Sequence, residues 1–461
     1  MATLASQLAD WATGLRYDDL PDPVVAAAKE SIRDTLAGAV LGARGQQFGS
    51  MVAGDARTAV ATSIGSARPT GLIAAATANA IAAHGCELDD TLLGAGGHPG
   101  AVVVPVALAT AEAAAGSGRD LITAVVAGYE LLYRVMAPIY PSNQPRGFQA
   151  TGVAGPFAAA ATAASIRGHG PETLTQAFGI AGSYAAGLLE YDQTGGECKR
   201  LYAGLAARAG LEAVELASAG ITGPATILEG RRGVFAGFGD QRETGRATDG
   251  LGRDFSILTR RRVKRYPAVG SFHGVLDALG TVLGERGETD PASVAAVDVF
   301  LAPLSVAHGG AVVAPTDVVS AQFSCAYSVA LRVLFGRNDL ELYEDRRLWT
   351  DPAVLAVAAR VTVQADDRLD PQAEQGRGRI SVHFTDGTVR EANAPVPAGR
   401  PDNPLPRDEM NARFTRFSRG LGESAQRRLD QALTHLEHLD GVGDLAGPLR
   451  TPLRPARTER N

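Results

Sequence analysis

The sequence predicts a mainly α fold, with a large all-helical domain followed by a smaller α+β domain. Two observations lead to this prediction. Apolar residues recur at i, i+3 and i+4 spacing in successive runs over residues 1–262. Segments rich in strand-forming residues begin only after Arg262, and two of them flank an Asp-Gly turn. The chain has 461 residues and is 45% hydrophobic, which is enough to build a sizeable core in each domain.

The first domain, residues 1–262, is expected to consist of helices separated by glycine and proline. The expected helices are 23–41, 72–83, 101–115, 119–136, 154–167, 172–189 and 200–219. Many of them are rich in alanine and glycine, and small side chains let helix backbones approach closely. We therefore expect a compact bundle with buried central helices. Gly179 and Gly182 are expected to serve this close packing and not a phosphate loop.

The second domain, residues 263–394, alternates helix-like and strand-like segments. Its expected elements are helices at 271–284 and 317–335 and strands at 293–302, 359–365 and 379–392. Asp386-Gly387 lies between two alternating segments and predicts a β-hairpin.

The rest of the chain is expected to return to the first domain. Residues 395–447 begin with a Pro-rich linker and continue into a helix at about 422–438. The tail 448–461, rich in proline and arginine, is expected to be disordered.

Composition excludes several classes of function. The net charge of −6 argues against a nucleic-acid-binding protein. No apolar run approaches the roughly 20 residues that a membrane span requires, and the N-terminus lacks the features of a signal peptide. Three widely spaced cysteines form no CxxC pair, which predicts neither disulfides nor a cysteine-ligated metal. We expect a cytoplasmic protein.

Residues 84–100 gather more ionisable groups than a folded interior uses for stability. This short span holds His84, Glu87, Asp89, Asp90 and His98 among glycines, between two apolar helices. Each desolvated charge costs several kcal/mol unless it is paired. Gathered in a cleft, the same groups can exchange protons with a substrate. We therefore interpret the span as the first wall of an active site.

Two alternatives remain for this span. Asp89, Asp90 and Thr91 can instead cap the segment that follows. His84, Asp89, Asp90 and His98 can also be considered as metal ligands, but they lack a regular ligand spacing such as HExxH. The prediction is therefore that the protein holds no metal.

Lys199 and Arg200 precede a long helix, and Lys199 is one of only three lysines in a chain rich in arginine. A helix N-terminus together with an ammonium group makes a natural site for a carboxylate. A solvated surface lysine is the alternative.

His273 begins another helix, whose dipole favours the neutral and basic imidazole, although a capping or core histidine fits as well. Tyr327 lies in an apolar helix, where core packing is the default interpretation. The histidines without a supporting pattern are treated as surface or structural residues. They are His169, His308, His383, His435 and His438.

The ordered set of sequence blocks resembles the MmgE/PrpD family, which includes 2-methylcitrate dehydratase, cis-aconitate decarboxylase and iminodisuccinate epimerase. The blocks are ESIRDTLAGAVLGAR (30–44), AHGCELDDT with HPGAVVVPVALATAEA (83–113), GYELLYRV (128–135), GFQATGVAGPFAAAA (147–161), KRLYAGLAARAGLEAVELA (199–217), RYPAVGSFHGVLDAL (265–279) and AQFSCAYSVALRVLFG (321–336). The resemblance covers nearly the whole chain. It implies that the α+β domain is a lid over a cleft, that the protein is a homodimer, and that no cofactor is required.

The family's cleft residues match this sequence at five positions: Thr91, His98, Lys199, His273 and Tyr327. Three other positions depart from the family's pattern. Glu87 stands where an aspartate is usual, and Tyr202 stands where histidine is common after Lys-Arg. Gln149 stands where many members carry histidine, and an amide cannot exchange a proton near neutral pH. These departures make ordinary 2-methylcitrate dehydratase or cis-aconitate decarboxylase activity a weaker expectation.

Our hypothesis is a cofactor-independent lyase, a dehydratase or a decarboxylase, that acts on a small carboxylate-bearing metabolite. The expected catalytic residues are His98, His273, Lys199 and Tyr327, and the expected substrate-binding residues are Glu87, Asp89, Asp90, Thr91, Gln149 and Arg200. The alternatives are an epimerase or isomerase of a dicarboxylate, a tailoring enzyme of secondary metabolism, and a ligand-binding relative without catalysis.

Overall fold

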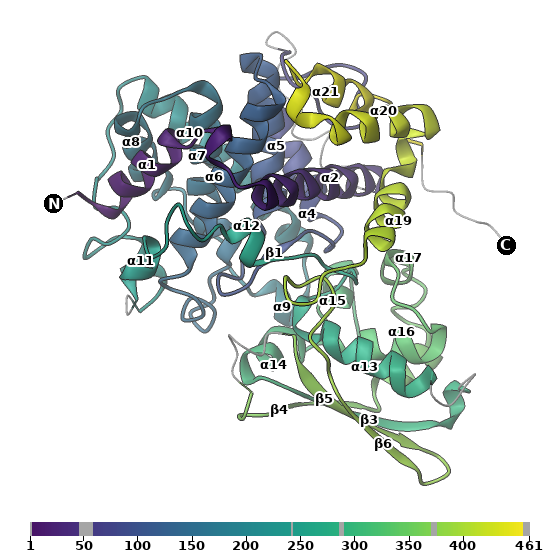
Figure 1. Cartoon of the computed structure of the whole chain (residues 1–461). Helices are drawn as coiled ribbons and strands as arrows, with labels where there is room; N and C mark the ends of the chain where they lie inside the picture. Colours follow the sequence, from purple (N-terminus) through teal and green to yellow (C-terminus); the bar gives the residue numbers. More distant parts are fainter. Residues whose placement is uncertain (1, 46–58, 241–242, 285–289, 370–375, 455–461) are drawn as a thin grey trace. The chain divides into compact units, whose positions relative to one another are not determined.

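A computed structural model describes residues 2–45, 59–240, 243–284, 290–369 and 376–454 (Figure 1). The chain divides into two compact units. Unit 1 comprises Met1–Leu188, Arg200–Arg261 and Pro406–Asn461, and unit 2 comprises Leu189–Lys199 and Arg262–Leu405. The stretch Leu189–Lys199 thus belongs to unit 2, although it lies inside the range 1–262 expected for the helical domain.

Unit 1 is helical, as the sequence predicts. Its helices are α1 (Leu4–Gly14), α2 (Asp22–Gly45), α4 (Leu72–His84), α5 (Pro99–Ala114), α6 (Gly118–Met136), α7 (Ala150–Arg167), α8 (Pro171–Ala181), α10 (Tyr202–Ser218), α11 (Val234–Phe238), α12 (Ser256–Thr259), α19 (Arg407–Ser418), α20 (Glu423–Thr434) and α21 (Gly443–Leu449). The short strand β1 (Thr91–Leu92) pairs with β2 (Arg261–Arg262).

Helix α7 is the centre of unit 1, and it packs against α5, α6 and α10 (Figure 1). Most of its residues are alanine, glycine or threonine, and they are buried. A Cβ atom added to Gly210 of α10 would lie 2.4 Å from the Cβ of Ala159 and 2.5 Å from the carbonyl oxygen of Pro156. Only glycine allows the two backbones to approach this closely. The predicted close-packed bundle is confirmed.

Local sequence signals set the helix ends of unit 1. The hydroxyl of Ser117 and the carboxylate of Asp120 form a capping box at the start of α6. The helix predicted over 172–189 is shorter than expected, because α8 ends at Ala181. Gly182 follows it, and Gly187 has a φ of 110°, which is incompatible with a right-handed helix.

Unit 2 is built on a four-stranded sheet. Its elements are α9 (Tyr191–Thr194), α13 (His273–Gly284), β3 (Val294–Leu301), α14 (Pro303–Gly309), α15 (Val318–Gln322), α16 (Cys325–Phe335), α17 (Leu340–Glu344), α18 (Pro352–Ala358), β4 (Val361–Ala365), β5 (Gly378–Phe384) and β6 (Val389–Asn393). The strand order is β4-β3-β5-β6, in which β4 is parallel to β3 and the other pairs are antiparallel. Figure 1 shows α13 lying along this sheet.

From Val297 to Leu301 of β3, buried side chains alternate with more exposed ones, as expected for a sheet covered on one face, whereas β5 has three consecutive buried residues at 380–382. The predicted hairpin is confirmed, with Gly387 in the left-handed region at a φ of 84°. The helix predicted over 317–335 is two helices, because the Ser324 hydroxyl caps α16 by accepting the amide of Tyr327.

The C-terminal segment differs from the expectation of a disordered tail over 448–461. Leu449 is buried in α21, and Arg450 pairs with Glu112 at 2.8 Å, so apolar burial and an ion pair order the part of the tail that the structure describes. Residues 455–461 lie outside the described residues.

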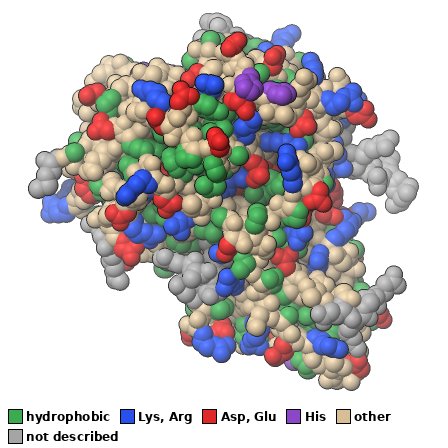
Figure 2. All heavy atoms as spheres, viewed as in Figure 1, with side chains coloured by type: hydrophobic (Ala, Val, Ile, Leu, Met, Phe, Trp, Pro, Cys, Tyr) green, Lys and Arg blue, Asp and Glu red, His purple; other side chains and the backbone are tan. Residues whose placement is uncertain are grey.

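The surface view in Figure 2 shows acidic and basic side chains interspersed over the viewed face. Among the described residues, no helix has the length and apolarity needed to cross a membrane.

Candidate active site

The predicted acid–base span folds into a sharp turn of unit 1 between two helices. Helix α4 ends at His84, and His98 is the residue before Pro99, the first residue of α5. Glu87 lies between them with a φ of 57°, a left-handed conformation that is unusual for a residue other than glycine. This turn brings the side chains of His84 and His98 into contact with each other.

Asp89 holds the two imidazoles together. Its Oδ2 atom lies 2.6 Å from Nδ1 of His84 and 3.1 Å from Nδ1 of His98. The two rings meet edge to face, with centroids 4.8 Å apart. All three residues are buried. We call His84, Asp89 and His98 the unit 1 cluster.

The charge of Asp89 is stabilised inside this cluster. Burial raises the pKa of its carboxyl, but the neighbouring His98 and His84 outweigh burial and hold this pKa well below its usual range. A carboxylate on Nδ1 fixes each imidazole in orientation and tautomer, so that Nε2 is the nitrogen available for proton exchange. Asp89 therefore positions histidines rather than presenting a free carboxylate.

Gln149 is linked to the same cluster. It caps α7, where its Oε1 accepts the amide of Gly152 at 2.7 Å. Its Nε2 lies 3.2 Å from the hydroxyl of Thr151, and that hydroxyl accepts the backbone amide of His98 at 3.0 Å. The structure therefore links Gln149 to the backbone of His98 through the hydroxyl of Thr151.

Asp90 has a different environment from Asp89. Its carboxylate accepts hydrogen bonds from Arg261 at 2.8 Å, from Tyr129 at 2.5 Å and from the amide of Gly100 at 3.1 Å. Burial raises the pKa of Asp90 despite these donors. Because Gly100 is in the first turn of α5, Asp90 serves as a helix cap, the alternative that the sequence left open.

The remaining predicted binding residues of unit 1 are partly or wholly buried. Glu87 is 2% exposed, Arg200 is 6% exposed, and Thr91 of β1 is half-buried.

Lys199 lies in the part of unit 2 that precedes α10. It belongs to a 3₁₀ turn, Glu197–Leu201, and is buried. Its Nζ atom lies 6.0 Å from the centroid of the Phe323 ring. The carboxylate of Asp317 accepts the amide of Gly196 at 2.7 Å and so ties this turn to the start of α15.

His273 and Tyr327 are both buried in unit 2. Nε2 of His273 donates to the carbonyl of Ala268 at 3.1 Å, so Nδ1 is the basic nitrogen of the neutral ring. Burial raises the pKa of Tyr327. Among the described residues, no group hydrogen-bonds to the Tyr327 hydroxyl. A buried hydroxyl of this kind is uncommon in a packed core and indicates a polar partner such as a ligand or water.

Two histidine–aspartate pairs of unit 2 had no signal in the sequence, and His308–Asp192 is the more buried of them. Nδ1 of His308 lies 2.6 Å from Oδ2 of Asp192, and the His308 ring meets Phe323 edge to face at 5.4 Å. The two residues are 116 positions apart, so no local spacing signals the pair.

The unit 1 cluster is also the candidate metal set among the described residues, because its ligand atoms lie within 4.8 Å of one another. Ligand atoms about 2.1 Å from a shared ion lie about 3 Å or more apart. The separation of 2.6 Å between His84 and Asp89 is shorter and is a hydrogen-bond distance. The observed geometry therefore fits a proton between these groups better than a metal ion.

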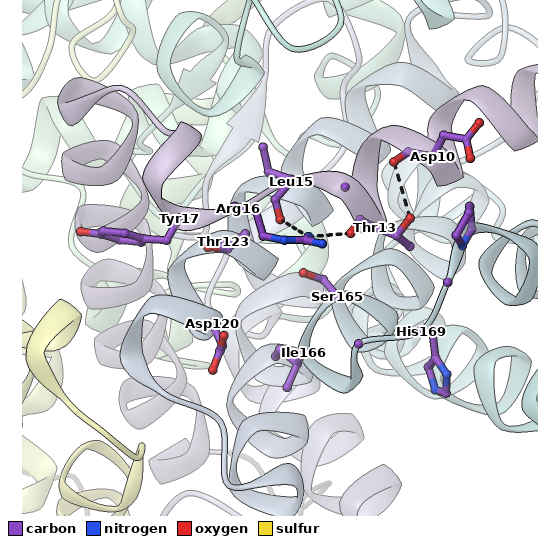
Figure 3. Close-up of a pocket in the computed structure, with 14 residues that line it drawn as sticks. Asp10, Thr13, Leu15, Arg16, Tyr17, Asp120, Thr123, Ser165, Ile166 and His169 are labelled. Atoms are coloured by element: carbon purple, nitrogen blue, oxygen red, sulfur yellow. Dashed lines mark hydrogen bonds between the residues drawn. The ribbon is translucent and has the colours of Figure 1, made fainter.

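A cavity of about 610 Å³ opens elsewhere in unit 1, and Figure 3 shows its lining. The Arg16 side chain donates there to the carbonyls of Thr13 and Leu15, at 2.8 and 3.0 Å. The cavity contains none of the predicted site residues.

Comparisons with known proteins agree along the whole chain. Residues 6–247 match the MmgE/PrpD N-terminal domain, and residues 266–438 match the MmgE/PrpD C-terminal domain. The chain is 27% identical to a cis-aconitate decarboxylase of Aspergillus terreus, over 98% of this chain and 96% of the relative. It is 28% identical to the cis-aconitate decarboxylase-like protein oryM of Aspergillus oryzae, over 96% of each chain. It is 25% identical to human cis-aconitate decarboxylase, over 96% of this chain and 93% of the relative.

Proposed function

Because the chain belongs to the MmgE/PrpD family, we propose that it is a lyase that releases CO2 or water from a small di- or tricarboxylate by acid–base chemistry, without a cofactor. One observation carries the proposal: the unit 1 cluster, in which a buried carboxylate fixes two imidazoles. The similarity to cis-aconitate decarboxylases makes cis-aconitate the first substrate to test.

The chemistry requires charge stabilisation at a carboxylate. When CO2 leaves an unsaturated tricarboxylate, the electron pair of the broken C–C bond is delocalised onto a neighbouring carboxylate. The ammonium of Lys199 would bind that carboxylate and stabilise its growing charge. Phe323 and the turn tied by Asp317 support the placement of Lys199.

The chemistry also requires proton transfer at carbon. His98, oriented by Asp89, is proposed to exchange one proton through Nε2. His273 or the buried hydroxyl of Tyr327 is proposed to act as its counterpart. Glu87, Thr91, Gln149 and Arg200 are proposed to contact the substrate. That residues of both units act on one substrate is part of this proposal.

The test is turnover in D2O followed by NMR, with cis-aconitate and then a panel of di- and tricarboxylates. We expect either release of CO2 with deuterium incorporated at carbon, or release of water with transfer of a carbon-bound proton to the solvent. Deuterium exchange or inversion without loss of CO2 or water would instead make the protein an epimerase or isomerase.

The matched variants are H98Q and H435Q, because His435 is an exposed histidine of unit 1 outside the cluster. H98Q is expected to lower kcat by a factor on the order of 10² or more, and H435Q to leave it unchanged. Equal turnover in the two variants would contradict the role of His98.

We also propose that the protein is a homodimer. Leu205 and Leu216 of α10 are 53% and 37% exposed, and their spacing of three helical turns places them on one face of this helix. Exposed apolar side chains on one face are typical of an interface. Sedimentation equilibrium should give twice the chain mass, and L205R should halve it. A monomeric mass for the wild-type protein would contradict the proposal.

A further inference from the structure

The His308–Asp192 pair has the geometry of a positioned acid–base group. Asp192 lies on α9 and His308 on α14, and their side chains are 6% and 20% exposed. Oδ1 of Asp192 accepts Nε2 of Gln193 at 2.6 Å, and the same Nε2 lies 2.9 Å from the carbonyl of Ala307. The carboxylate is therefore fixed, and it fixes His308 through Nδ1.

The remaining ring nitrogen of His308 is the reactive one. Among the described residues, none forms a hydrogen bond with Nε2 of His308. A carboxylate on one imidazole nitrogen, with the other nitrogen left for substrate, is the arrangement that acid–base catalysis uses.

The Phe323 ring contacts this imidazole and also lies near the proposed carboxylate anchor, Lys199. The ring meets His308 edge to face at 5.4 Å and lies 6.0 Å from Nζ of Lys199. Tyr191 meets the same ring at 5.2 Å. All of these residues belong to unit 2. An acid bound by Lys199 would lie against the ring that also supports His308.

We propose that His308, oriented by Asp192, is a further acid–base residue of the lyase reaction and exchanges protons with the substrate held by Lys199. This inference rests on the proposed function. It assigns unit 2 a proton-exchanging group in addition to His273 or Tyr327, in a chain that carries Gln149 at the family's usual histidine position.

The proton transfer balances without a co-reactant. In a decarboxylation, the C–C bond to the departing carboxylate breaks and CO2 leaves without the electron pair. That pair forms a new C–H bond with the Nε2 proton of the His308 imidazolium. The imidazole is then neutral, and water returns the proton.

The kinetic test uses H308Q and D192N in the full-length protein. H308Q should lower kcat on the order of 10²-fold, and D192N about tenfold, because Asp192 acts through His308. The KM of each variant should stay within about threefold of wild type. The matched control is H383Q, because His383 pairs with Asp298 at 2.9 Å on the exposed part of the same unit. Wild-type kcat in H308Q, or an equal loss in H383Q, would overturn the proposal.

A binding test separates this proposal from the proposed function. In protein labelled with ¹³C at the Cε1 of its eight histidines, the signal absent from H308Q identifies His308. Addition of citrate should shift that signal in wild type but not in K199M. A shift without turnover of any acid would support the pairing with Lys199 and count against the lyase. Turnover with no shift would overturn the role of His308 alone, and absence of both would overturn both.

Discussion

The two units each hold a histidine on a buried aspartate, with the same separation and different surroundings. Nδ1 of His84 and Nδ1 of His308 each lie 2.6 Å from a carboxylate oxygen, of Asp89 and Asp192 respectively. Asp89 serves two imidazoles, that of His84, which is fully buried, and that of His98, which is 10% exposed, whereas Asp192 serves one imidazole that is 20% exposed. A histidine–aspartate pair of the same geometry can thus be buried and structural, as at His84, or accessible to substrate and solvent, as at His308. Burial of the imidazole, and not the length of its hydrogen bond, distinguishes the two.

The largest expected effect comes from removing the carboxylate that serves two histidines. D89N should lower kcat about 10³-fold, because an amide cannot hold both imidazoles in the required tautomer. D192N, which frees one imidazole, should cost only about tenfold. Steady-state kinetics of the two variants beside D298N measures the difference, since Asp298 pairs with the exposed His383. If D192N lowers kcat as much as D89N, the unit 1 cluster and the His308–Asp192 pair do not differ in their importance for catalysis as we propose.

The next effect concerns the ring that His308 and Lys199 share. F323L keeps an apolar side chain but removes the flat surface that both groups contact. We expect kcat to fall and KM to rise, together lowering kcat/KM by about 10- to 100-fold. The control is F300L, because Phe300 lies on β3 beneath Arg379 and outside the cluster. An unchanged kcat/KM in F323L would show that the Phe323 ring does not position His308 and Lys199 for catalysis.

A stability measurement tests the charge of Asp89. Its pKa is lower in the folded protein than its usual value, so it contributes stability above the unfolded pKa of about 3.9. That contribution is lost as pH falls through the lower folded pKa. Urea denaturation should therefore show D89N less stable than wild type at pH 6, with the gap narrowing below about pH 4.

The pKa of Asp90 is shifted in the opposite direction from that of Asp89, so its effect on stability has the opposite pH dependence. Its folded pKa is raised, so its protonated form contributes stability that is fully present below the unfolded pKa and is lost as pH rises through the folded pKa. The gap between D90N and wild type should therefore narrow as pH rises above about 4. Parallel pH profiles for D89N and D90N would contradict this assignment of the two carboxylates.

The smallest effect belongs to Gln149. Q149A removes the side-chain cap of α7 and should lower the free energy of unfolding by about 1 kcal/mol. Chemical denaturation measures this change. Q431A, on the exposed face of α20, is the control and should change stability by less than about 0.5 kcal/mol. An unchanged free energy of unfolding in Q149A would mean that the Gln149 side chain does not stabilise the N-terminus of α7.

Local sequence signals pointed to the unit 1 cluster but not to the His308–Asp192 pair of unit 2. His84, Asp89 and His98 lie within one turn between two helices, so the density of ionisable residues revealed them. Asp192 and His308 become neighbours only because the stretch Leu189–Lys199 folds with unit 2. Nothing in the sequence around His308 distinguishes it from a surface histidine.

The helical bundle, the sheet with its hairpin and the family could all be predicted from the amino-acid sequence, because helix periodicity, turn chemistry and ordered motifs are local properties of the chain. Tertiary structure decided the roles of adjacent residues. Asp89 and Asp90 are neighbours in sequence, yet their pKa values shift in opposite directions. The physical reason is that a buried charge responds to the groups that surround it in space. At Asp89 two histidines outweigh the effect of burial on the pKa, whereas at Asp90 burial outweighs Arg261, Tyr129 and a helix amide.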